Sequence, residues 1–113
     1  MKNYASIIGS VVTVTVDRPM GSVHPKHRDI IYPINYGYIE GVKALNDEWQ
    51  DAYILGVDEP IESFTGKVIA VIHRFDDVED KWVVCPENMS FSKKEIAEKT
   101  DFQERFFKME IMV

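Results

Sequence analysis

Cysteine is almost absent from this chain of 113 residues, which contains only Cys85. A single cysteine forms no internal disulfide and no cysteine-cluster zinc site, so the sequence predicts a reducing, cytoplasmic location. No apolar run has the length of a signal peptide or a membrane span, and we expect no membrane partner. Basic residues are also few, because 13 Lys and Arg stand against 19 Asp and Glu, for a net charge of -6. This balance argues against general nucleic-acid binding, which requires surplus positive charge.

The composition is otherwise that of a folded globule, with 45% hydrophobic and 28% charged residues. The length predicts a single domain, residues 1–113. Short segments rich in β-branched residues alternate with turns rich in Gly, Pro and acidic residues, which indicates a mainly β (α+β) fold with five or six antiparallel strands in a barrel or sandwich. The expected strands are 11–16, an irregular pair within 30–40, 52–57, 67–74 and 81–85.

The C-terminal part carries the one helix signal. Ser92 and Glu95 fit a capping box, in which the two side chains satisfy backbone donors of the first helical turn. Phe102, Phe106 and Phe107 are predicted to share an apolar face against the strands. The tail 109–113 is predicted either to add an edge strand or to contact a partner.

Two acidic clusters, 47–51 and 76–80, are candidates for chemistry. Carboxylates crowded on neighbouring loops repel each other unless cations share them, and Mg²⁺ prefers such oxygen ligands. The alternative is that they are solvated turns, and composition alone favours that alternative. Possible anion contacts surround the clusters, although each one taken alone is better explained as a surface charge or a core ring. They are Lys26, Lys67, Lys81 and Lys108, with the hydroxyls of Tyr32, Tyr36 and Tyr38.

The segment Tyr32-Pro33-Ile34-Asn35-Tyr36-Gly37-Tyr38-Ile39 resembles the Tyr-Pro-x-Asn-Tyr-Gly-[Tyr/Phe]-Ile segment of the soluble, Mg²⁺-dependent inorganic pyrophosphatases. Segment 46–55 is similar to the Asp-x-Asp-Pro-x-Asp signature of that family and its following strand. Segment 76–86 is similar to the family's acidic hairpin, which ends in Asp-x-Lys and a Val-rich strand. Upstream 14–19 and downstream 102–110 also resemble family segments, in the same order.

The resemblance implies an OB-type, five-stranded antiparallel β-barrel with a C-terminal helix. It also implies hydrolysis of pyrophosphate with Mg²⁺ or Mn²⁺ by a homo-oligomer. Carried over position by position, Glu48 and Tyr36 match catalytic positions, Asp17 matches an upstream Glu, and Asp77 and Asp80 stay open as alternatives to neighbouring metal ligands. The matching metal ligands are Asn46, Asp47, Asp51, Asp76 and Glu79, and the matching substrate contacts are Lys26, Lys81 and Lys108.

Several positions depart from the family pattern. Asn46 stands where the first metal Asp is expected, Trp49 replaces a Pro, and Phe107 replaces a Tyr. The family hairpin that carries a phosphate-binding arginine is reduced here to 27–31, so that His24 or Arg28 must supply the contact or it is lost. These departures motivate the alternative hypothesis of a degenerate pyrophosphatase that binds a phosphate compound or a protein partner without efficient turnover.

Overall fold

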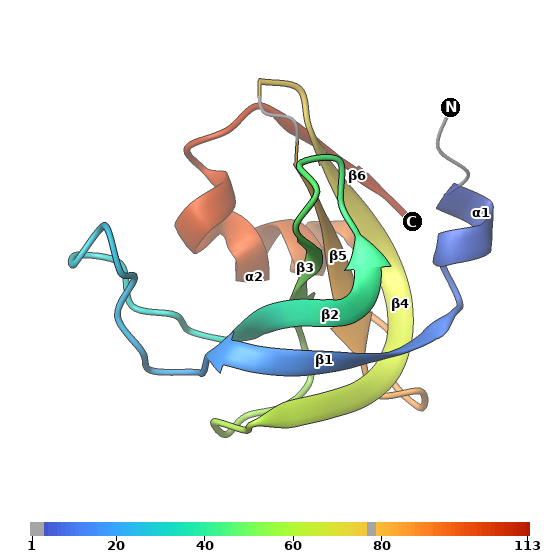
Figure 1. Cartoon of the computed structure of the whole chain (residues 1–113), viewed down its shortest axis with the longest axis horizontal. Coiled ribbons are helices and arrows are strands. Elements are labelled where there is room, and N and C mark those ends of the chain that lie inside the picture. The colour runs from blue at the N-terminus through green and yellow to red at the C-terminus, as the bar shows by residue number, and fades with distance from the viewer. Residues whose placement is uncertain (1–3, 77–78) are drawn as a thin grey trace.

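The computed structural model describes residues 4–76 and 79–113, and its centre is a closed β-barrel (Figure 1). Within these residues the sheet has six strands, in the order β1-β2-β3-β5-β4-β6, and an additional β1–β4 pairing closes the first five into a ring. No described helix has the length and apolar character needed to cross a bilayer. The elements are α1 (Tyr4–Ile7), β1 (Val11–Arg18), β2 (Asn35–Lys43), β3 (Trp49–Ile54), β4 (Ser63–Arg74), β5 (Asp80–Cys85), α2 (Lys93–Glu104) and β6 (Met109–Met112).

The predicted five-stranded barrel with a C-terminal helix is confirmed, but its strands are mixed rather than all antiparallel. Four neighbouring pairs of the ring are antiparallel, and β3 runs parallel to β5. The reason is geometric, because strand directions cannot alternate all the way round a ring with an odd number of members. The parallel pair places the acidic end of β3 beside the acidic end of β5.

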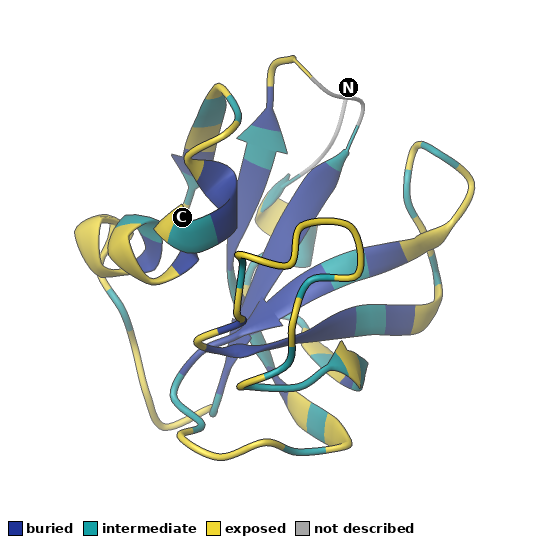
Figure 2. Cartoon of the chain, turned by 90° about the vertical axis from the view of Figure 1, so that its left-hand side faces the viewer, coloured by how far each residue is buried: buried dark blue, intermediate teal, exposed yellow. Residues whose placement is uncertain are grey.

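The core consists of two clusters of buried side chains, one inside the barrel and one under α2. In β1, Val14 is fully buried while Val12 and Val16 pack partly against the same cluster, as the predicted alternation requires. Figure 2 shows buried residues continuing along the strands and exposed residues gathering in the loops. Cys85 is buried, and burial raises the pKa of its thiol.

The predicted capping box begins α2, with Glu95 N donating to Ser92 Oγ and Ser92 N donating to Glu95 Oε1. The helix ends at Glu104, before two of the three phenylalanines that were expected on its apolar face. Phe102 packs on the core, but Phe106 is 62% exposed, so the prediction of one shared face was wrong. The tail forms β6, an edge strand that pairs with β4, as one of the two alternatives predicted.

Candidate functional site

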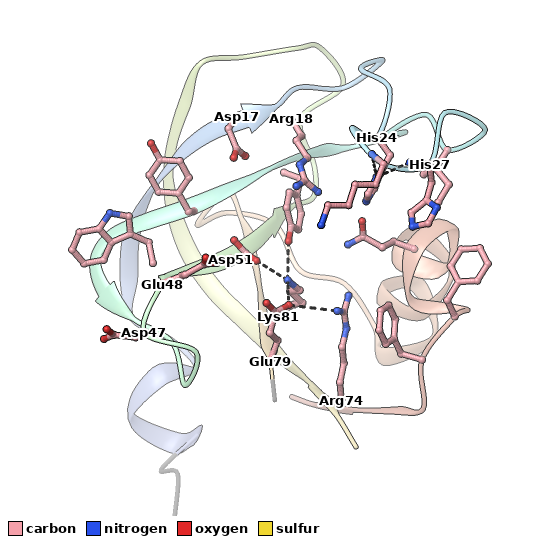
Figure 3. A pocket seen from close by; sticks show the side chains of 18 of the residues that line it. Asp17, Arg18, His24, His27, Asp47, Glu48, Asp51, Arg74, Glu79 and Lys81 are labelled. Carbon is pink, nitrogen blue, oxygen red and sulfur yellow. Dashed lines mark hydrogen bonds and ion pairs between the residues drawn. The ribbon is translucent and has the colours of Figure 1, made fainter. Parts of the chain in front are cut away.

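A pocket of about 900 Å³ opens where the barrel meets the 19–34 loop and the end of α2 (Figure 3). Its walls come from segments far apart in the sequence, including β1, β2, β3, β4 and β5. The two acidic segments therefore converge, as the hypothesis of shared cations requires. Most of the proposed site residues line this pocket: Lys26, Tyr36, Asp47, Glu48, Asp51, Glu79 and Lys81.

Lys81 is the centre of the pocket's polar contacts. Its Nζ donates to Asp51 Oδ2 at 2.6 Å, to Glu79 Oε2 at 2.8 Å and to the Tyr36 hydroxyl at 2.9 Å. The ammonium has three protons, so these contacts use all of its donors. Lys81 is only 3% exposed, and a charge buried so deeply is stable only when it is paired.

A second cation, Arg74, lies beside this centre. Its guanidinium forms a two-pronged pair with the buried carboxylate of Glu104, with Nε to Oε1 at 3.0 Å and Nη2 to Oε2 at 2.5 Å. Glu79 Oε2 lies 3.7 Å from Arg74 Nη1, and the ring of Phe107 covers the guanidinium at 3.7 Å from its centroid. Arg74 thus connects the end of α2 to the Lys81 centre.

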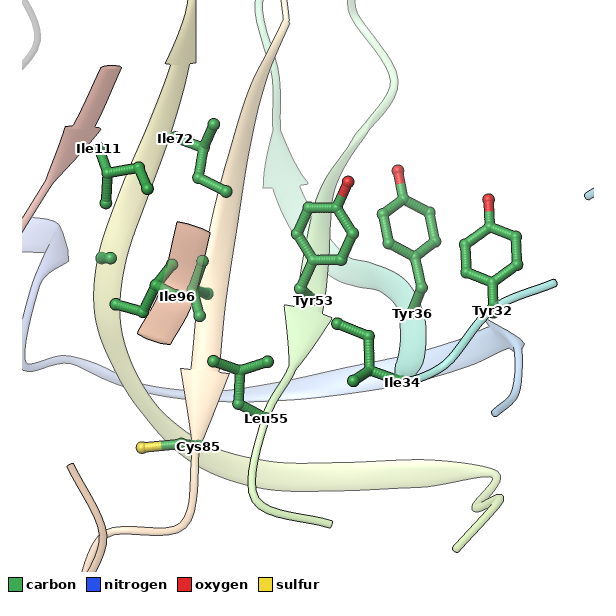
Figure 4. Close-up of a cluster of buried hydrophobic side chains, with 11 residues drawn as sticks. Tyr32, Ile34, Tyr36, Tyr53, Leu55, Ile72, Cys85, Ile96 and Ile111 are labelled. Carbon is green, nitrogen blue, oxygen red and sulfur yellow. The ribbon is translucent and has the colours of Figure 1, made fainter. Parts of the chain in front are cut away.

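Three tyrosines form the apolar floor under these charges, and their hydroxyls point the same way (Figure 4). The Tyr32 hydroxyl donates to Gln103 Oε1, Gln103 Nε2 donates to the Tyr53 hydroxyl, and Tyr53 donates to Glu104 Oε2. Burial, followed by the charge of Glu104, raises the pKa of Tyr53 well above its usual 10.0. Burial, followed by the charge of Asp51, does the same for Tyr36. Both phenols therefore act as neutral hydrogen-bonding groups.

Arg18 and Lys26 are two further cations that line the pocket. In the described part of the chain, no carboxylate lies within ion-pair distance of Arg18 or Lys26. Arg18 Nη1 donates to the Tyr32 hydroxyl at 2.6 Å, and the guanidinium lies over the rings of Tyr32 and Tyr36. His24 lines the same wall, where burial and then the nearby charge of Arg18 lower its pKa.

Some predicted site residues lie elsewhere. Asp76 accepts a hydrogen bond from the backbone N–H of Lys108 at 3.2 Å, and both residues are exposed outside the pocket lining. Asp80 points to the opposite face of β5 from Lys81 and pairs with His73 at 2.8 Å, because side chains alternate along a strand. Lys67 and Arg28 are not among the lining residues either, and Asp77 lies outside the described residues.

The Asn-Tyr-Gly motif has a local explanation for each residue. Asn35 is fully buried and ties two loops, accepting from Met20 N and donating to Glu59 O. Tyr36 turns into the pocket. A Cβ at Gly37 would lie 1.9 Å from the Thr15 carbonyl oxygen, so only glycine lets β1 approach this closely. Two of the three residues therefore serve the fold rather than the chemistry.

The sequence interpretation missed Arg18, Arg74, Gln103 and Glu104. One signal for Arg74 was available: Ala70, Ile72 and Arg74 share one face of β4 by period-two spacing, and the first two are fully buried. An arginine that continues a buried face predicts a buried acidic partner. Nothing in the sequence pattern indicated which carboxylate that partner is.

The arrangement of the predicted metal ligands does not fit a magnesium ion. Of the predicted ligands, Asp51 and Glu79 meet at Lys81, while Asp47 is 87% exposed and pairs with Lys43. Asn46 directs its amide nitrogen at Glu79 Oε1 at 2.8 Å, and its Oδ1 accepts from Glu48 N. Among the described residues, no three His, Cys, Asp or Glu side chains gather closely enough to hold a metal ion. Asp47, Asp51 and Glu79 accept hydrogen bonds from the protein's own donors.

The barrel and helix place the chain in a structural class, the OB-type barrels with the architecture of soluble inorganic pyrophosphatases. It is similar to the inorganic pyrophosphatase of Ehrlichia chaffeensis, with 13% identity, a TM-score of 0.68 and coverage of 91% of this chain and 85% of that one. It is also similar to the inorganic pyrophosphatase of Coxiella burnetii, with 13% identity, a TM-score of 0.67 and coverage of 92% of this chain and 84% of that one. The inorganic pyrophosphatase of Neisseria gonorrhoeae shares 19% identity, with a TM-score of 0.61 and coverage of 88% of this chain and 79% of that one. No protein-family model and no curated protein sequence matches the chain. At these identities the similarity shows a shared fold.

Proposed function

We propose that the chain binds a phosphate anion of the pyrophosphate class in the pocket of the barrel, with little or no hydrolysis. The observation that supports this proposal is that Arg18 and Lys26 line the pocket while, among the described residues, no carboxylate lies within ion-pair distance of either. A guanidinium can contact two phosphate oxygens at once, and an ammonium acts as a compact charge. His24 adds a further donor on the same wall.

In this proposal Arg18 supplies the phosphate contact that an arginine of the longer family hairpin would make, since that hairpin is reduced here to the loop 27–31. The sequence offered His24 or Arg28 as substitutes, and of these two only His24 lines the pocket. Arg18 lies at the end of β1 and is held by the Tyr32 hydroxyl, so its guanidinium is positioned before any ligand arrives. Preorganised donors lose less entropy on binding than flexible ones.

Calorimetric titration with pyrophosphate tests the proposal. Arg18→Met removes a charge-assisted contact worth about 1.5–3 kcal/mol, so affinity is expected to fall tenfold or more. Arg28→Met is the matched control, because it removes the same charge from the neighbouring loop outside this pocket. If wild type shows no binding, or if both variants lose affinity equally, the proposed anion site is refuted.

Metal-dependent hydrolysis of pyrophosphate is the second candidate function. Asp51, Glu79, Glu48 and Tyr36 all line the same pocket, which favours it. It requires Asp51 and Glu79 to leave Lys81 before they serve any other cation. Release of phosphate from pyrophosphate with Mg²⁺ or Mn²⁺, abolished by Asp51→Asn, would establish hydrolysis. Tight binding without release would establish the binding function.

A further inference from the structure

Lys81 lies between two carboxylates that a metal-binding pocket would need to leave open for the ion. Asp51 lies in β3 and Glu79 lies directly before β5, and both contact the same nitrogen, at 2.6 and 2.8 Å. Figure 3 shows the ammonium between these two groups, with the carboxylates directed at it. A cation held by oxygens of Asp51, Glu79 and Tyr36 is already present here, and it belongs to the chain.

The neighbouring groups also occupy both carboxylate oxygens of Glu79. Glu79 Oε1 accepts from the Asn46 amide, while Oε2 accepts from Lys81 and lies near Arg74. A neutral amide that offers its N–H to a carboxylate competes with a metal for that oxygen. Mg²⁺ loses its own water reluctantly and needs carboxylate oxygens that are not already paired, and neither oxygen of Glu79 is unpaired.

All three donors of Lys81 are also committed inside the protein. Lys81 therefore cannot contact a phosphate oxygen without releasing Tyr36 or a carboxylate. Its charge still acts on the pocket, because it cancels part of the negative charge that would otherwise repel an anion. Direct contacts to the anion are left to Arg18 and Lys26.

We propose that the ammonium of Lys81 takes the place of a divalent metal ion between Asp51 and Glu79, so that the pocket binds its phosphate ligand without metal. The part that concerns the ligand rests on the proposed function. The part that concerns Lys81 stands on the contacts of this one side chain. The two parts make separate predictions.

Titration of the metal-free protein with Mn²⁺ tests the role of Lys81. Binding is measured as the loss of the electron paramagnetic resonance signal of the free ion. Wild type is expected to bind Mn²⁺ weakly or not at all. Lys81→Met keeps an unbranched side chain, one heavy atom shorter, and frees the two carboxylates, so Mn²⁺ affinity is expected to rise by about tenfold or more. Lys26→Met is the matched control, since no carboxylate in the described segments lies within ion-pair distance of this lysine, and Mn²⁺ affinity should not rise.

Each outcome decides the proposal. Equal Mn²⁺ affinity in wild type and Lys81→Met, whether strong or absent, overturns it, as does an equal gain in Lys26→Met. Lys81→Gln, checked for folding by circular dichroism, replaces Lys81→Met if the latter does not fold. The expected gain is the same because glutamine is also uncharged.

Pyrophosphate titrations with EDTA and with Mg²⁺ separate this inference from the proposed function. We expect the two affinities of wild type to agree within about threefold, because no metal is needed. Binding that disappears in EDTA and returns with Mg²⁺ overturns the inference and leaves the proposed function in place. Absence of binding under both conditions overturns the proposed function, and the Mn²⁺ titrations then decide the role of Lys81 alone.

Discussion

Replacing Glu104 by glutamine tests whether the pair between Glu104 and Arg74 holds α2 against the barrel. The Glu104 carboxylate is 2% exposed and accepts from Arg74 Nε at 3.0 Å, from Arg74 Nη2 at 2.5 Å and from the Tyr53 hydroxyl at 2.6 Å. Glutamine keeps the volume but removes the charge, and its amide nitrogen must face one of the three donors. Arg74 then faces a neutral amide in place of a carboxylate, with Glu79 3.7 Å away and partly exposed.

Removing one partner of a buried pair costs about 3–5 kcal/mol, and the remaining Glu79 contact places Glu104→Gln near the lower limit, at about 3 kcal/mol. This is a large part of the roughly 5–15 kcal/mol that stabilises a typical domain. Urea unfolding followed by tryptophan fluorescence measures it, since Trp82 is buried in the core. The dependence of the unfolding free energy on urea should not change.

Asp101→Asn is the control for this experiment. Asp101 pairs with Arg105 on the exposed side of the same helix, with both side chains more than half exposed. Such a pair contributes about 0.3–0.5 kcal/mol. If Glu104→Gln costs no more than Asp101→Asn, the buried pair does not stabilise the helix against the barrel, and the reasoning from burial is refuted.

Two further predictions concern the barrel and its tyrosines. Gly37→Ala should lower the free energy of unfolding by about 2 kcal/mol or more, because the new Cβ meets the backbone of β1. Gly41→Ala is the control, because nothing lies within 4 Å of the new Cβ and only the φ of 90° opposes a side chain. It should lower the free energy of unfolding by about 1 kcal/mol. Equal losses for Gly37→Ala and Gly41→Ala in urea unfolding would contradict the steric argument. The raised pKa values of Tyr36 and Tyr53 stabilise the fold fully below the ordinary tyrosine pKa of 10.0, and this contribution is lost as the pH rises above it, because the unfolded chain ionises first. Urea midpoints should therefore fall above about pH 10, and less steeply in Tyr53→Phe; a midpoint that does not change with pH would show that the phenols are not buried as described.

The sequence predicted individual elements well where the signal is local. The alternation of Val and Thr in β1 and the capping box of α2 depend on neighbours a few residues away, and both are found as expected. The prediction of the C-terminal end of α2 failed, because no local signal marks where the helix stops. The Phe pattern indicated a helix beyond residue 104, but Phe106 and Phe107 lie after its end, and Phe107 covers Arg74 instead.

For the pocket, the hypothesis of shared cations required the segments 47–51 and 76–80 to meet, and the structure brings Asp51 and Glu79 together. It did not indicate what neutralises them. Whether a carboxylate faces a metal, a lysine or water depends on which side chains of neighbouring strands point the same way.

The local pattern of residues alone determined the strands, the helix start and the acidic segments, because these depend on spacing within a few residues. Only the closure of the barrel decided the partners: Lys81 meets Asp51 across 30 positions, and Arg74 meets Glu104 across another 30. Strand order and register set such contacts, since a side chain pairs with what the neighbouring strand places opposite it. The same geometry separates Asp76 and Lys108 from the pocket, although their positions in the sequence suggested that they belong to it.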